Sequence, residues 1–245
     1  GKGSGAVSML RCASLRRPAL LRAGVRRLFI QTESTPNPEA LKFIPGKPVL
    51  ESGTRDFRSL KEAQASPLAR RLFAAEGVAS VFLSVEFVTV GKSKEADWLA
   101  LKPLVFGAIM DHYAAGEPAL NDGDGADEEV DSLTIRDDDS EVVQMIKELL
   151  EMRIRPSVQE DGGDIVYRGF DEETGIVELQ MQGSCAGCPS SSVTLQAGIE
   201  NMLRHYIPEV KEVRDVGNDA DELDENEGFE VNMMDMVKTK PPPSK

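Results

Sequence analysis

The sequence of 245 residues contains no apolar run long enough to cross a lipid bilayer. The longest apolar stretch, residues 78–90, is interrupted by Glu86, whereas a membrane-spanning helix needs about 20 mainly apolar residues. This absence predicts a chain with no membrane-spanning segment. At roughly 100–150 residues per domain, the length favours two small domains over one large domain.

Basic residues are scarce outside the first 32 positions. Residues 1–32 hold seven of the 28 Lys and Arg residues and no Asp or Glu, so the other 21 basic residues stand against all 42 acidic ones. The resulting net charge of −21 over residues 33–245 repels nucleic acid and anionic lipid. We therefore predict that neither nucleic acid nor a membrane is a partner.

Cysteine and histidine are also rare, with 3 and 2 residues. Cys12 lies in the basic leader, so the body holds only Cys185 and Cys188, too few for a disulfide framework. Nothing at ligand spacing accompanies His112 or His205, and we interpret both as structural residues. No nucleophile–base constellation and no phosphate loop is present, so the sequence predicts a binding protein and not an enzyme.

The first 28 residues have the composition of a mitochondrial targeting segment. They are rich in arginine, contain serines and lack acids. Arginines interrupt every apolar window, whereas a secretory signal needs about 7–15 uninterrupted apolar residues. We predict that residues 1–28 are a transit peptide for the mitochondrial matrix; the alternative is a disordered basic tail.

The remaining sequence predicts an α+β fold with two small mixed α/β domains. In the first domain, residues 29–116, we expect strands at 29–32, 40–44, 78–83 and 87–90, and helices at 66–77 and 97–115. In the second, residues 139–216, we expect a helix from residue 140 that Pro156 limits, a turn at 161–164, strands at 165–170 and 176–181, a helix at 190–206 and a strand at 210–216. The second domain therefore has the order α-β-β-α-β.

Acidic segments lie between and after the two domains. Residues 117–141 contain 11 acidic residues and a single basic one, Arg136. Such a segment buries too little apolar surface to order itself. We predict that residues 117–138 form a flexible acidic linker and that residues 217–245 form a disordered acidic tail.

One motif carries recognisable chemistry: Gly183-Ser184-Cys185-Ala186-Gly187-Cys188-Pro189 lies between a predicted strand and a predicted helix. The CxxC spacing points both sulfurs at one centre. Proline suits the first helical position, and the free N–H groups of that turn stabilise thiolates. The small neighbouring residues let the backbone approach inorganic sulfide. Cys185 and Cys188 are therefore the candidate cluster or metal ligands.

Two thiolates are fewer than the four ligands of a closed zinc or [4Fe–4S] site. A two-fold axis through the loop would assemble four cysteines from two chains. We expect such a shared site to be exposed, which suits a cluster that is handed on. The motif alone leaves three alternatives open: a thiol–disulfide oxidoreductase, a zinc-bridged dimerisation module and a pair of buried, inert thiols.

Two groups of residues resemble the Nfu family. Phe29–Thr32, Thr35–Pro38, Leu41–Phe43 and Pro45–Lys47 are similar to its N-terminal domain, and Arg155-Pro156, Glu160–Asp164 and Gly183–Ser191 are similar to the NifU-type C-terminal domain. The resemblance implies an iron–sulfur scaffold or carrier that binds a [4Fe–4S] cluster through Cys185 and Cys188. It also implies a homodimer when cluster-bound, assembly proteins as cluster donors, and mitochondrial apo-proteins as recipients, among them lipoate synthesis and respiratory enzymes.

Overall fold

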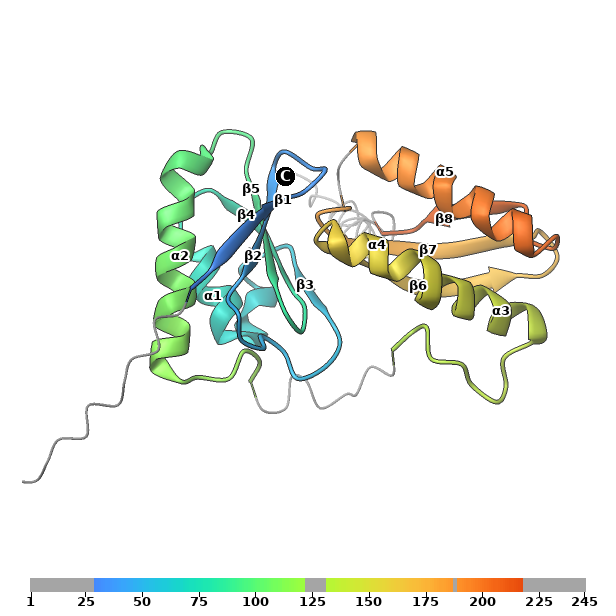
Figure 1. Ribbon diagram of the computed structural model, residues 1–245, viewed down its shortest axis with the longest axis horizontal. Helices are drawn as coiled ribbons and strands as arrows, with labels where there is room; N and C mark the ends of the chain where they lie inside the picture. The colour runs from blue at the N-terminus through green and yellow to red at the C-terminus, as the bar shows by residue number, and fades with distance from the viewer. Residues whose placement is uncertain (1–28, 122–130, 187–188, 218–245) are drawn as a thin grey trace, which may run out of the picture.

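The computed structural model describes residues 29–121, 131–186 and 189–217 and is drawn in Figure 1. These residues form two α+β domains, each with its own sheet and hydrophobic core, which confirms the predicted fold class. The predicted transit peptide, Cys188 and residues 218–245 of the predicted tail lie outside the described residues. Within the described ranges, no helix has the length and apolar character needed to cross a membrane.

The first domain is a five-stranded antiparallel sheet with two helices on one face (Figure 1). Its strands lie in the order β1-β2-β5-β4-β3. Their bounds are β1 Gln31–Ser34, β2 Ala40–Ile44, β3 Arg55–Phe57, β4 Val78–Leu83 and β5 Val88–Lys92. The helices are α1 Pro67–Phe73 and α2 Trp98–Ala115, and a 3₁₀ turn, η1, spans Glu62–Ala65.

Capping residues determine where the two helices of this domain begin and where α2 ends. The Ser66 side chain accepts the N–H of Ala69 at the start of α1, and Asp97 accepts the N–H of Leu99 at the start of α2. Gly116 ends α2 in the left-handed conformation, with φ 69°. β3 and η1 were not predicted, and the first strand begins two residues later than predicted, because these short polar elements carry little hydrophobic periodicity.

The second domain consists of a three-stranded sheet and the helices that pack against it. Its elements are α3 Glu141–Leu149, the π-helical turn η2 Leu150–Ile154, α4 Arg155–Glu160, β6 Gly163–Asp171, β7 Ile176–Gly183, α5 Pro189–Tyr206 and β8 Glu212–Asp215. β6 and β7 are antiparallel, and β8 lies parallel to β7. Two parallel neighbouring strands need a long crossover connection, and α5 is that connection between β7 and β8. The observed elements follow the predicted order α-β-β-α-β.

The prediction that Pro156 limits the first helix of this domain is wrong. The chain stays helical as far as Glu160, because the turn at 150–154 widens and the N–H of Arg155 donates to the carbonyl of Leu150. Pro156 then stands in the first turn of α4, where its missing N–H leaves no bond unmade. The extra helix carries Arg155 and Val158 towards β6.

The predicted flexible linker at 117–138 needs correction at both ends. Ala119 and Leu120 pack against the first core. Residues 131–139, which we call the strap, pack on the second domain, where Leu133 is 4% exposed within the core. Lys147 binds the strap through the Asp139 carboxylate at 2.6 Å. Basic partners and one apolar anchor thus order a segment that composition alone assigns to disorder.

Candidate functional site

Cys185 lies in the loop between β7 and α5, against the turn that joins α4 to β6. Gly163 pairs with Gly183 at the ends of β6 and β7. The Ser184 N–H donates to the carbonyl of Gly162 at 3.3 Å, and the Ser184 hydroxyl donates to the carbonyl of Asp161 at 2.5 Å. The turn and the loop therefore form one unit, residues 161–163 with 183–186, which we call the cysteine seat.

Two glycines are required where the seat closes. Gly183 has φ +67°, and a Cβ there would lie 2.8 Å from the carbonyl oxygen of Gly162 and 3.0 Å from the ring of Phe82. A Cβ on Gly163 would lie 2.9 Å from the sulfur of Cys185. From the sequence, residues 161–164 are predicted to form a turn. The structure shows that this turn makes room for the cysteine sulfur, and the adjacent glycines were the signal for it.

Cys185 is 4% exposed and belongs to the core of the second domain. The expectation of an exposed site is therefore wrong for this cysteine in the arrangement described. Cys188 lies outside the described residues, whereas Pro189 opens α5. Among the residues that the structure describes, no three His, Cys, Asp or Glu side chains lie close enough together to hold a metal ion.

A buried ion pair fixes β6 beside the seat. Asp164 is 1% exposed and accepts from Nε and Nη2 of Arg155 at 3.0 and 3.1 Å. Arg155 also pairs with Asp131 of the strap and with Glu151. Burial opposes the charge on Arg155, but the hydrogen bonds to its carboxylate partners outweigh it and raise the pKa of the guanidinium. This network was not predicted from the sequence, because its partners come from separate segments.

The two histidines lie outside the seat. His112 is 3% exposed, on α2 in the first domain, and burial lowers the pKa of its imidazole. His205 lies exposed in the last turn of α5, and that helix begins beside the cysteine loop, so its last turn lies at the far end. Neither side chain reaches the seat, as expected from a structural interpretation of both.

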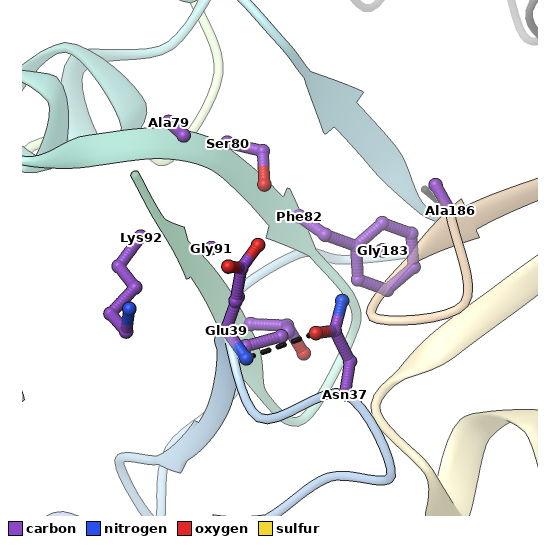
Figure 2. Close-up of a pocket in the computed structure, with 11 residues that line it drawn as sticks. Asn37, Glu39, Ala79, Ser80, Phe82, Gly91, Lys92, Gly183 and Ala186 are labelled. Carbon is purple, nitrogen blue, oxygen red and sulfur yellow. Dashed lines mark hydrogen bonds between the residues drawn. The ribbon is translucent and has the colours of Figure 1, made fainter. Parts of the chain in front are cut away.

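The first domain also contributes to the site. Thr89 donates its hydroxyl hydrogen to the carbonyl of Gly162 at 2.7 Å, and the Asn37 amide donates to the carbonyl of Ser184 at 3.2 Å. A cavity of about 200 Å³ lies between this domain and the loop. Figure 2 shows residues that line it, with the ring of Phe82 beside Gly183. The seat therefore has one wall from each domain.

Comparison with known proteins agrees with this architecture. A family model described as "Scaffold protein Nfu/NifU N terminal" matches residues 30–116, and one described as "NifU-like domain" matches residues 146–214. The chain is 58% identical over 188 residues to NifU-like protein 5, mitochondrial, of Arabidopsis thaliana, which covers 77% of this chain and 68% of the relative. It is 51% identical over 231 residues to the NFU1 iron-sulfur cluster scaffold homolog, mitochondrial, of Drosophila sechellia, covering 93% and 78%.

The two-domain α+β fold with its cysteine seat, taken with these matches, defines a cluster carrier and not an enzyme. The chain belongs to the Nfu/NifU family of iron–sulfur cluster scaffold proteins. Like these relatives it is a mitochondrial protein. The resemblance noted from sequence motifs is thus confirmed, and the oxidoreductase alternative falls with it.

Proposed function

We propose that this chain binds a [4Fe–4S] cluster between two copies of itself, through Cys185 and Cys188 of each, and delivers it to apo-proteins in the mitochondrial matrix. The observation that carries this proposal is the seat itself. It holds Cys185 between a strand and a helix N-terminus, among residues with little or no side chain. The proposed recipients are lipoate synthesis and respiratory enzymes, and the proposed donors are iron–sulfur assembly proteins.

The chemistry of the donor set fits such a cargo. Iron–sulfur clusters are held by cysteine thiolates, usually four for a [4Fe–4S] cluster. The second domain supplies two cysteines, and the only other cysteine of the sequence is Cys12 in the leader. Two copies supply the four thiolates. A site divided between two chains releases its cluster when the chains separate, which suits delivery better than permanent storage.

The test is anaerobic reconstitution of the apo protein with ferrous iron and sulfide. We expect about one [4Fe–4S] cluster per two chains, with four thiolates per cluster. The readouts are bound iron and sulfide, the Mössbauer spectrum and the mass of the complex in solution. The loaded protein should then transfer its cluster to an apo-protein that accepts [4Fe–4S].

Single-cysteine variants provide the controls. Cys185→Ser and Cys188→Ser should each abolish stable cluster binding, because a hydroxyl is a poor iron ligand near neutral pH, whereas Cys12→Ser should bind normally. A full cluster on a strictly monomeric chain would contradict the shared site. Zinc at one ion per two chains, with no bound sulfide, would instead favour the zinc-bridged dimerisation module.

A further inference from the structure

The first domain faces the cysteine seat with the side of its sheet that carries no helix (Figure 1). Residues alternate between the two sides of a strand. On β2, β4 and β5, the neighbours of Lys42, Phe82 and Thr89 point to the core beneath α1 and α2. Lys42, Thr89 and Phe82 are direct cross-strand partners, so they form one row on the opposite side. We call this row, with Asn37 from the turn before β2, the sheet cover.

The sheet cover makes directed hydrogen bonds to the seat. Thr89 is 2% exposed and donates to the carbonyl of Gly162, while Asn37 donates to the carbonyl of Ser184, the residue before the cysteine. Asp56, which continues the row on β3, bonds to the backbone of Gly183. All three bonds run from side chains of the first domain to backbone groups of the seat, so the contact has a defined register.

Lys42 ties the same row to the helix before the seat. Its ammonium donates to the carbonyls of Gln159 and Glu160 at 3.2 and 3.1 Å. These are carbonyls of the last turn of α4, where the helix dipole favours a positive charge. The same ammonium pairs with Glu33 of β1 at 3.3 Å. The contact between the domains therefore combines charge with hydrogen bonding.

Occupancy by the first domain leaves no room for a second loop on this side of the seat. The residues before and after Cys185 both face the first domain: Ser184 bonds to Asn37, and Ala186 lines the cavity of about 200 Å³ in Figure 2. Cys185 is 4% exposed, buried in the core of its own domain while the loop residues on either side of it lie against the first domain. This exposure is too small for iron shared with another chain to reach its sulfur while the first domain holds the loop in place.

We propose that the sheet cover and the cysteine loop of a second copy compete for the same face of the seat. The closed chain is then a cluster-free monomer with a shielded Cys185, and the shared cluster forms only on chains whose first domain has moved away. This inference rests on the shared site proposed above. Because cover and seat belong to one chain, their contact is intramolecular and outcompetes a second copy at low protein concentration.

The first experiment measures shielding and needs no cluster. The full apo chain is treated with iodoacetamide, and alkylation of Cys185 is followed by site-resolved mass spectrometry. Asn37→Ala combined with Thr89→Val removes two bonds to the seat, so we expect alkylation about tenfold faster than in the wild type. The matched control is Asn121→Ala with Thr32→Val, which loses the same side-chain types within the first domain but away from the seat. Equal rates in the interface variant and the control would overturn the proposal.

A second variant guards against misfolding. If thermal melts show that the double variant has lost its first domain, Lys42→Met provides the comparison, because it removes the bonds to α4 and keeps an apolar stem on the sheet. Alkylation of Cys185 should again be faster than in the control. No change in a folded Lys42→Met protein would count against the cover.

The second experiment measures pairing. After reconstitution with iron and sulfide, the double variant should form cluster-bound dimers at a protein concentration about tenfold lower than the wild type requires. Faster alkylation with unchanged pairing would overturn the competition. Faster alkylation with no cluster on any variant would leave the cover standing and reject the shared cluster, so the two proposals fail separately.

Discussion

At the scale of single residues, Gly163 is a tightly packed position of the seat. A Cβ there would lie 2.6 Å from the carbonyl oxygen of Gln182 and 2.9 Å from the sulfur of Cys185. We expect Gly163→Ala to lower the free energy of unfolding by about 1–3 kcal/mol through overpacking. Denaturant unfolding of the apo chain measures the change.

Gly198 provides the control for that substitution. It lies in α5, and a Cβ on it would meet no heavy atom within 4 Å. Gly198→Ala should leave stability unchanged or raise it by about 0.5–1 kcal/mol, since alanine is the better helix former. If both variants behaved alike, the steric role of Gly163 would be rejected.

The burial of Cys185 changes what its substitution should do to the apo fold. An exposed cysteine could become serine at little cost, but a cysteine that is 4% exposed behaves as a small apolar side chain. Cys185→Ser brings a hydroxyl into this site and should destabilise the apo chain by about 1–3 kcal/mol. Cys185→Ala should cost less stability, although we expect both variants to lose the cluster. A higher melting temperature for Cys185→Ser than for Cys185→Ala would contradict a buried apolar position.

His112 should make the stability of the first domain depend on pH. Burial lowers the pKa of its imidazole below the value of about 6.5 in the unfolded chain. As pH falls through about 6.5, the unfolded chain takes up a proton that the folded chain refuses, so stability is lost on the acid side. Urea unfolding at about pH 7.5 and pH 5.5 measures the loss, and His112→Gln should reduce it. An unchanged slope in that variant would assign the pH dependence elsewhere.

At the scale of elements, the strap is the feature with the clearest energetic test. Leu133 is 4% exposed in the second core, whereas Ile135, two residues further along, is 49% exposed. Leu133→Ala should lower the free energy of unfolding by about 2–5 kcal/mol, and Ile135→Ala should have little effect. Chemical unfolding of the two variants compares them directly. If both substitutions changed the free energy of unfolding by the same small amount, the segment would be a flexible linker, as the sequence predicted.

The elements that the sequence predicted well are those set by their own residues. The capped helices at Ser66 and Asp97 follow from local signals, and the hairpin of β6 and β7 follows from strand propensity and a glycine turn. The strap was missed because its order depends on Lys147 and Arg155, which lie beyond it in the sequence. Local composition cannot show such partners.

The same distinction holds at the site. The cysteine spacing and its place between strand and helix are properties of one short segment, and both were predicted. The burial of Cys185 depends on Gly163, which pairs across the hairpin, and the contact of its loop with Asn37 depends on another domain. These features arise from tertiary packing, which no periodicity in the sequence encodes.

At the scale of the whole molecule, the strap defines where the second domain begins. Leu133 belongs to its core, and Asp131 pairs with Arg155. A fragment of residues 131–217 should therefore fold and bind the cluster, and it should exceed a fragment of residues 139–217 in stability by about 2–5 kcal/mol, the value of one buried leucine. Chemical unfolding and iron content after reconstitution test both fragments. If the two fragments had equal stability, the second domain would begin at residue 139, as the sequence predicted.

The strap also lies along the outer strand of the second sheet. β6 is the edge strand in the order β6-β7-β8, and an uncovered edge invites strand addition by another chain. Ser132 accepts the N–H of Tyr167 at 2.9 Å, next to an irregularity of the β6–β7 register between Tyr167 and Gly169. The strap contact and the irregular register both hinder another strand from pairing along this edge. The chain is thereby protected from sheet-to-sheet aggregation at this edge, and under the proposed function its copies can meet and separate without joining their sheets there.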